Sequence, residues 1–146
     1  IPPFHAVPLR HRADGWTPVR QAEFIGYLAA TRSVAAAARG VSMARETAYR
    51  LRARPGAQGF AAAWDVALAR PRSEAGRARL EAALAAARAA REAHRKVTIP
   101  ELEWRVAPGL WQVMLRGGRY VGVVRKPDET ALLALLSRTR AAAGRA

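Results

Sequence analysis

Cysteine is absent from the 146-residue sequence, so disulfide bonds, cysteine-ligated zinc sites and thiol nucleophiles are excluded. No run of about 18 apolar residues is free of arginine or proline, which argues against a membrane-spanning helix. No charged and then apolar signal peptide opens the chain either. These absences make the cytoplasm the expected location of the protein. If the protein binds DNA, we expect it to associate with the nucleoid.

Acidic residues are scarce: 11 aspartates and glutamates stand against 25 lysines and arginines, and the formal net charge is +14. Lysine itself is nearly missing, since only Lys96 and Lys126 occur. The positive charges of such a chain repel one another unless a polyanion binds and neutralises them. We therefore expect nucleic acid as the partner, with an acidic protein or a membrane surface as alternatives.

The sequence also lacks a constellation of residues typical of catalysis or metal binding. The histidines at His5, His11 and His94 show no i, i+4 pairing, and we expect no carboxylate partner near them. No glycine-rich phosphate loop follows a strand, and no serine lies in a nucleophile elbow. We expect that the protein is not an enzyme and binds neither a cofactor nor a metal ion.

Residues 1–15 contain three prolines, which exclude a helix, and they lack the alternation of a strand. We interpret them as an extended arm that Arg10 and Arg12 make basic. Two interpretations of this arm stay open. It is either a loosely packed terminus or a segment that lies along a phosphate backbone or in a minor groove.

Two short helices with a tight turn between them are predicted over Ser33–Arg54, SVAAAARGVSMARETAYRLRAR. A helix capped by Thr17 precedes them, and Ser33 caps the first of the pair. Its alanines let two backbones cross closely at a steep angle. In the second helix Ala48 and Leu51 continue the buried stripe, and the residues that project outward are Arg45, Glu46, Thr47, Tyr49 and Arg50.

This stretch resembles the helix-turn-helix of bacterial regulators, in which the second helix enters the major groove. The resemblance implies base contacts by Arg45, Glu46 and Arg50, and phosphate contacts by Thr47 and Tyr49. Two positions depart from the pattern: Ala44 replaces the expected Ser or Thr N-cap, and Ser42 stands where glycine is commoner. An alternative is that Ser42 caps the helix one residue earlier.

The resemblance covers roughly Trp16 to Ala69. This part is similar to small helix-turn-helix proteins of alphaproteobacteria and to the DNA-binding end of phage small-terminase-type proteins. A helix over Phe60–Leu68 completes it, with Trp64 as an expected core anchor. Residues 16–70 are therefore predicted as a helix-turn-helix DNA-binding domain, and Arg52 and Arg54 extend its basic surface.

The chain after Pro71 changes character. An alanine- and arginine-rich helix is predicted over Ser73–Lys96, with only a thin apolar seam. The period then changes to two, and Trp111–Arg116 and Arg119–Arg125, joined by Gly117-Gly118, predict a β-hairpin. In its two-residue register Leu115 opposes Tyr120, Val113 opposes Gly122 and Trp111 opposes Val124.

Arg116 and Arg119 flank the hairpin turn, where like charges are unfavourable unless an anion is near. The tip is either solvated or a second DNA contact, like a wing. A last helix over Thr130–Arg140 has a wide leucine face that needs a partner: the hairpin, the long helix or a second subunit. Residues 71–146 are thus a possible dimerisation element.

The sequence therefore predicts a mostly α fold with a small C-terminal β-hairpin (α+β): a helix-turn-helix bundle, a long helix, the hairpin and a terminal helix. The expected function is sequence-specific binding of double-stranded DNA as a transcriptional regulator; alternatives are a phage-derived packaging protein and a nucleoid-type architectural protein. One short recognition helix buries too little for selective binding, so we expect a homodimer or higher homo-oligomer. The expected DNA contacts are Arg10, Arg12, Ser42, Arg45, Glu46, Thr47, Tyr49, Arg50, Arg52, Arg54, Arg116 and Arg119.

Overall fold

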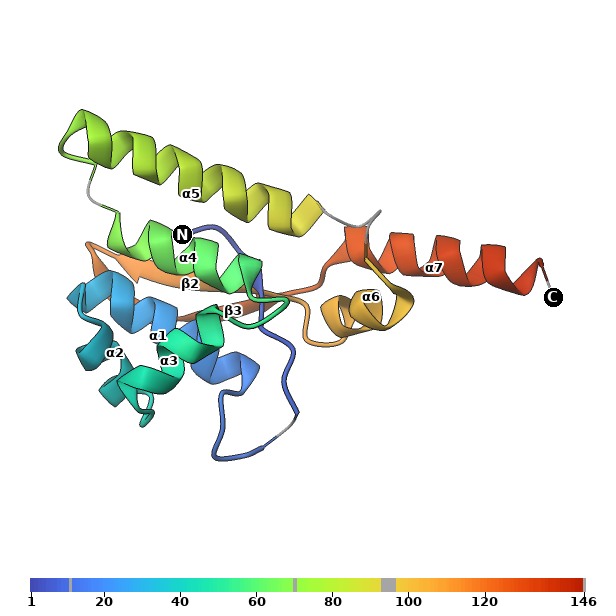
Figure 1. The fold of residues 1–146 in the computed structure, drawn as a ribbon, viewed down its shortest axis with the longest axis horizontal. Coiled ribbons are helices and arrows are strands. Elements are labelled where there is room, and N and C mark those ends of the chain that lie inside the picture. Colours follow the sequence, from blue (N-terminus) through green and yellow to red (C-terminus); the bar gives the residue numbers. More distant parts are fainter. Residues whose placement is uncertain (11, 70, 93–96, 146) are drawn as a thin grey trace.

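The structure is a computed structural model that describes residues 1–10, 12–69, 71–92 and 97–145. Within these residues it is mostly helical with a small antiparallel sheet, as predicted (Figure 1). Predictions that fall on His11, Arg70, His94 and Lys96 lie outside the described residues. The elements in chain order are β1 (Phe4–His5), α1 (Pro18–Thr31), α2 (Val34–Gly40), α3 (Arg45–Arg52), α4 (Gln58–Leu68), α5 (Glu74–Glu92), α6 (Ile99–Val106), β2 (Leu110–Arg116), β3 (Arg119–Lys126) and α7 (Glu129–Ala143).

The helices of the first half begin where local capping signals predict. The Thr17 hydroxyl accepts a hydrogen bond from the backbone N–H of Arg20, and the Ser33 hydroxyl accepts one from Ala36. Each bond satisfies a helix N–H that has no partner within the helix. These caps fix the starts of α1 and α2, and hence the direction in which the chain enters the turn between α2 and α3.

An aromatic cluster between α1 and α4 forms the centre of the core. The ring centroid of Phe24 lies 6.0 Å from that of Phe60 and 5.1 Å from that of Trp64. All three side chains are buried. Trp64 is thus a core anchor, as predicted, and the large side chains of α1 and α4 supply the apolar area that the alanines of α2 lack.

The start of the chain corrects the prediction that residues 1–15 form an arm without strand structure. Phe4 and His5 pair antiparallel with Trp111 and Leu110, so β1 is the edge of the sheet β1-β2-β3. Phe4 and Val7 are fully buried. Proline excludes a helix here but permits a short edge strand, because an edge needs hydrogen bonds on one side only.

The hairpin forms as predicted near its turn, but its register shifts further along. Leu115 pairs with Tyr120, and Val113 then pairs with Val123 instead of Gly122 because of a β-bulge. Side chains alternate between faces, so the extra residue brings both Tyr120 and Val123 onto the face that packs against the core. The Tyr120 ring lies 4.9 Å from that of Tyr27 in α1.

Burial at this contact raises the pKa of Tyr120 to about 12, and the charges of Glu23 and Tyr27 act in the same direction. The neutral phenol is therefore the form that packs against α1.

A further correction is α6, because the sequence predicted no helix between the long helix over Ser73–Lys96 and the hairpin. The Thr98 hydroxyl accepts from the backbone of Glu101, and the Glu101 side chain accepts from the backbone of Thr98. This capping box, with proline in the first turn, starts a helix that ends at Val106. The helix α6 packs against α7, so α7 finds part of its partner within the chain.

A buried hydrogen bond joins β1 to the start of α7, and it corrects the expectation that the histidines have no carboxylate partner. Nε2 of His5 lies 2.5 Å from Oδ2 of Asp128, and both side chains are buried. The other oxygen of Asp128 accepts from the backbone N–H of Ala131 and caps α7. Near this pair, burial lowers the pKa of Arg105, which the carboxylates of Asp128 and Glu101 oppose. The strand β1 therefore fixes the start of α7.

Candidate nucleic-acid interface

The turn between α2 and α3 is tight and is closed by backbone hydrogen bonds. Val41 is buried beneath it, and Ser42 has a φ of 59°, in the left-handed region. The backbone N–H of Ser42 donates to Arg39 and that of Met43 donates to Ala38. Glycine adopts this φ without a steric penalty, so serine here costs about 1 kcal/mol. Having serine at position 42, where glycine is commoner, therefore lowers the stability of the turn.

The start of α3 lacks a side-chain cap. Its N-cap is Ala44, with φ −76° and ψ 139°, and no side-chain hydrogen bond reaches its first N–H groups. The alternative that Ser42 is the N-cap is therefore wrong. Glu46 in the first turn is the acidic side chain that complements the positive end of the helix dipole.

The outward face of α3 is basic and exposed. Arg45, Glu46 and Arg50 are exposed, whereas Ala48 and Leu51 on the opposite face are buried. Arg45 lies 3.7 Å from Glu46, and both side chains are more than half exposed, so water screens the pair. These three side chains point away from the core and are able to reach a partner that lies along α3.

Tyr49 has two environments. Its ring lies 5.3 Å from the ring of Trp64, and the residue is 49% exposed. The core thus holds one side of the ring, while the rest faces the same solvent as Arg45 and Arg50.

Thr47 is engaged within the protein. Its hydroxyl donates to the backbone oxygen of Ala44 and accepts from the indole N–H of Trp16, at 2.6 and 3.0 Å. The hydroxyl proton that a phosphate contact would use is therefore already donated. Instead, Thr47 fastens the segment before α1 to the first turn of α3.

Arg52 faces α4 rather than solvent. Both terminal nitrogens of its guanidinium donate to Oδ1 of Asp65 at 3.1 Å, and its central carbon lies 4.9 Å from the ring of Trp64. A charge held in this way contributes to the packing of α3 on α4. Arg54, just beyond the helix, is exposed. Of these two arginines, Arg54 is the one whose charge faces outward.

The basic loop before α1 lies beside α3 (Figure 1). Trp16 bonds Thr47 near the start of α3, and Pro8 lies so close to Gly56 beyond its end that a Cβ there would be 3.1 Å from the proline ring. Arg10 and Arg12 are exposed between these two contacts. The structure thus brings the predicted arm and the predicted recognition helix together.

The hairpin tip forms a separate basic patch. Arg116 and Arg119 are exposed and directly paired across the turn. The hairpin packs on α1, which in turn packs on α2, whereas α3 packs on α2 and α4. The hairpin and α3 therefore pack on different helices of the core.

Gln21 and Arg20 were not identified from the sequence, although they position this surface. The Gln21 amide is fully buried; it accepts from the N–H of Val7 at 2.6 Å and donates to the oxygens of Val7 and Trp16. Arg20 donates to the backbone oxygens of Ala13 and Gly15. The available signal was a glutamine on the same helical stripe as the buried Phe24, Ile25 and Leu28.

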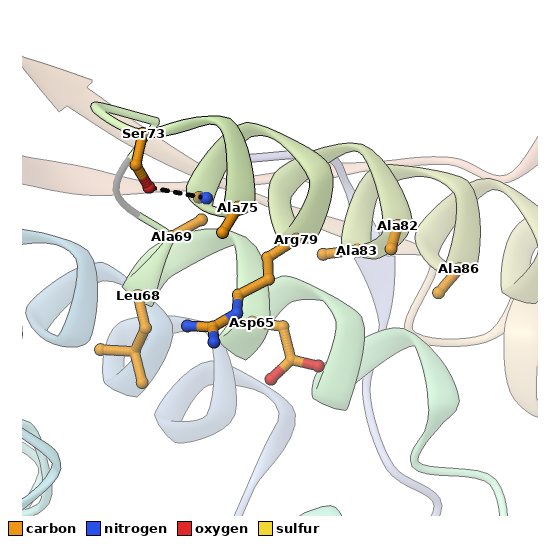
Figure 2. Close-up of a pocket in the computed structure, with 10 residues that line it drawn as sticks. Asp65, Leu68, Ala69, Ser73, Ala75, Arg79, Ala82, Ala83 and Ala86 are labelled. Carbon is orange, nitrogen blue, oxygen red and sulfur yellow. Dashed lines mark hydrogen bonds between the residues drawn. The ribbon is translucent and has the colours of Figure 1, made fainter.

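A hollow of about 650 Å³ lies between α4 and α5. Figure 2 shows its α5 side lined by alanines, with Arg79 extending from α5 toward α4 and Asp65 on the α4 side. The Asp65 carboxylate already accepts from Arg52. The hollow therefore offers mainly small apolar side chains, and we assign no ligand to it.

In the part of the chain that the structure describes, no three histidine or acidic side chains are placed to hold a metal ion. No helix among the same residues has the length and apolar character to cross a membrane. Comparison with protein-family models finds no match, and comparisons with curated proteins and with solved structures find none either. Any function must therefore be argued from the chain's own residues.

Proposed function

We propose that the protein binds double-stranded DNA through α2 and α3, with α3 entering the major groove, and that it acts as a sequence-specific transcriptional regulator. The observation that carries the proposal is the two-sided character of α3. Arg45 and Arg50 face outward beside the basic loop, while Ala48 and Leu51 lock the helix onto the core. The net charge of +14 suits a polyanionic partner.

Specific contacts would come from the exposed side chains of α3. An arginine makes two parallel hydrogen bonds to O6 and N7 of guanine, which suits Arg45 or Arg50, and Glu46 is able to accept from N4 of cytosine. The weak ion pair between Arg45 and Glu46 exchanges easily for such contacts, because both groups are already solvated.

Phosphate contacts would come from the flanks of α3. Arg10 and Arg12 in the loop beside α3 and Arg54 beyond the end of α3 are all exposed. Each phosphate that an arginine neutralises releases condensed counterions, so affinity should fall steeply with salt. Thr47 and Arg52, whose polar groups bond within the protein, would position α3 and not contact DNA directly.

The test is to select a preferred site from random duplexes and then measure affinity by fluorescence anisotropy on that site and on random DNA. Arg50→Ala should weaken the specific site by about 1–3 kcal/mol, roughly 5- to 150-fold, and leave random DNA much less affected. Arg88→Ala removes the same charge from the exposed face of α5 and serves as the matched control.

An equal loss on both DNAs would mean that Arg50 contacts only phosphate. If Arg88→Ala weakened binding as much as Arg50→Ala did, or if selection returned no preferred site, α3 would not be the reading element.

A second candidate function rests on the arginines outside α3. Arg77 and Arg88 of α5 and both arginines of the hairpin tip are exposed, so positive charge covers much of the molecule. Such a surface suits a phage-derived packaging protein or a nucleoid-type architectural protein. Footprinting across the source genome separates the three roles. A transcriptional regulator should protect discrete promoter sites, a packaging protein a single site, and an architectural protein broad stretches of DNA.

A further inference from the structure

The terminal helix α7 has one face inside the molecule and one face outside. Ala131 is buried against the rest of the chain, and Arg138 on the same side donates to the backbone oxygen of Val97. Opposite them Leu133 and Leu136 are 67% and 54% exposed. Packing against α6 therefore leaves the outer side of α7 uncovered.

Four exposed residues form a straight line on that side, which we call the outer stripe: Glu129, Leu133, Leu136 and Arg140. They are spaced i, i+4, i+7 and i+11, and at 3.6 residues per turn they fall within about 60° of arc. Leu132 is exposed beside this line. Neither Glu129 nor Arg140 belongs to an ion pair within the described residues.

The outer stripe has an acidic residue at one end, a basic residue at the other and two leucines between them. Its midpoint lies between Leu133 and Leu136. A two-fold axis through that midpoint places Glu129 opposite Arg140 of the partner subunit and Leu133 opposite Leu136 of the partner subunit. The pattern is thus complementary to itself when two helices run antiparallel, as a two-fold interface requires.

We propose that α7 pairs antiparallel with α7 of a second copy of this chain through the outer stripe. The two leucines of each copy exclude water at the centre, and the two ion pairs close the ends. A parallel pair would instead place Glu129 against Glu129 of the partner subunit and Arg140 against Arg140 of the partner subunit. Charge alone therefore selects the antiparallel arrangement.

A second copy fits this surface better than an acidic partner does, because the stripe itself carries no net charge. The surface also lies at the end of the molecule opposite α2 and α3 (Figure 1). Two copies joined here would leave both α3 helices uncovered. One helix pair buries much less than the roughly 1,600 Å² of a standard interface, so we expect a dimer that dissociates in the micromolar range.

The test is sedimentation velocity of the full chain from about 1 to about 200 μM, a range that spans weak dimerisation. Wild type should shift from monomer toward dimer. E129R and R140E should each weaken the dimer at least 10-fold, because each places like charges opposite one another at both ends. An equimolar mixture of the two variants should restore dimer, since the two basic ends of one variant then face the two acidic ends of the other.

Two further variants separate the stripe from the other exposed apolar surface. Leu133→Gln should abolish dimer, whereas Val121→Gln, at the 57% exposed Val121 of β3, should leave it unchanged. Circular dichroism checks that each variant keeps the helical content of wild type.

A wild-type monomer throughout the range would overturn the proposal. So would a mixture of E129R and R140E that stays monomeric. Loss of dimer in Val121→Gln with retention in Leu133→Gln would assign the interface to the sheet instead.

Discussion

The buried amide of Gln21 should be among the most sensitive positions in the protein. Its oxygen accepts from the N–H of Val7, and its nitrogen donates to the backbone oxygens of Val7 and Trp16. In this way the side chain takes the place of a neighbouring strand for Val7, which has no room to bond water because it is fully buried. Replacing Gln21 with leucine keeps the approximate volume and removes all three bonds.

The loss of stability in Gln21→Leu follows from the backbone groups of Val7 that the substitution leaves without partners. The N–H and the oxygen of Val7 stay buried without their partner, at about 1–3 kcal/mol each, and the leucine side chain offsets about 1–2 kcal/mol through apolar burial. With the middle of each range, about 4 kcal/mol lost and about 1.5 kcal/mol regained, we expect Gln21→Leu to lower the free energy of unfolding by about 2.5 kcal/mol. That is a large fraction of the roughly 5–15 kcal/mol that stabilises an ordinary domain.

Urea unfolding followed by tryptophan fluorescence measures this change. Gln58→Leu, at the exposed start of α4, is the matched control and should change stability by less than about 0.5 kcal/mol. A loss below about 1 kcal/mol for Gln21→Leu would contradict the reasoning, because it would mean that the backbone of Val7 does not depend on this amide.

Two more changes test the packing of the hairpin and the start of α3. Gly26→Ala should lower the free energy of unfolding by about 1–3 kcal/mol, because the new methyl group would overlap the ring of Tyr120. This loss of stability should largely disappear in a Tyr120→Ala background. An equal loss in both backgrounds would mean that the new methyl group does not meet the Tyr120 ring. Ala44→Ser should raise stability by about 1 kcal/mol in thermal unfolding, since α3 lacks a side-chain cap; an unchanged melting temperature would indicate that those N–H groups already have partners.

Features whose signals are local were predictable from the sequence. Thr17 and Ser33 cap α1 and α2 through hydroxyls three residues before the N–H groups they bind. The spacing of Ala48 and Leu51 likewise predicted which side of α3 is buried. Such patterns lie within one helix turn, so no knowledge of the rest of the chain is needed.

Features that depend on distant partners were not predictable in the same way. The two residues of β1 are a strand only because β2 lies beside them, and the bulge in the hairpin keeps Tyr120 against α1. The helix α6 is different, because the capping box of Thr98 and Glu101 is visible in the sequence. Pro100 is compatible with this helix, because proline fits the first turn.

The same distinction holds for the candidate site. Periodicity identified Arg45 and Arg50 as outward residues, and the structure places them so. Thr47 and Arg52 lie on the same helix, yet they bond Trp16 and Asp65, which belong to other elements. No spacing within α3 reveals partners that only the fold brings together.

The pairing of His5 with Asp128 also sets the order in which the nascent chain is able to assemble. These residues are 123 positions apart, so at about 5–20 residues per second the ribosome adds Asp128 roughly 6–25 seconds after His5. Until Leu110 and Trp111 of β2 have been added, Phe4, which the finished molecule buries completely, has no strand to join. Helix α3 is synthesised early, whereas β1 pairs only after the hairpin has been made. A message truncated before the hairpin codons would therefore yield a chain with an unpaired apolar strand, open to chaperones, proteases and aggregation.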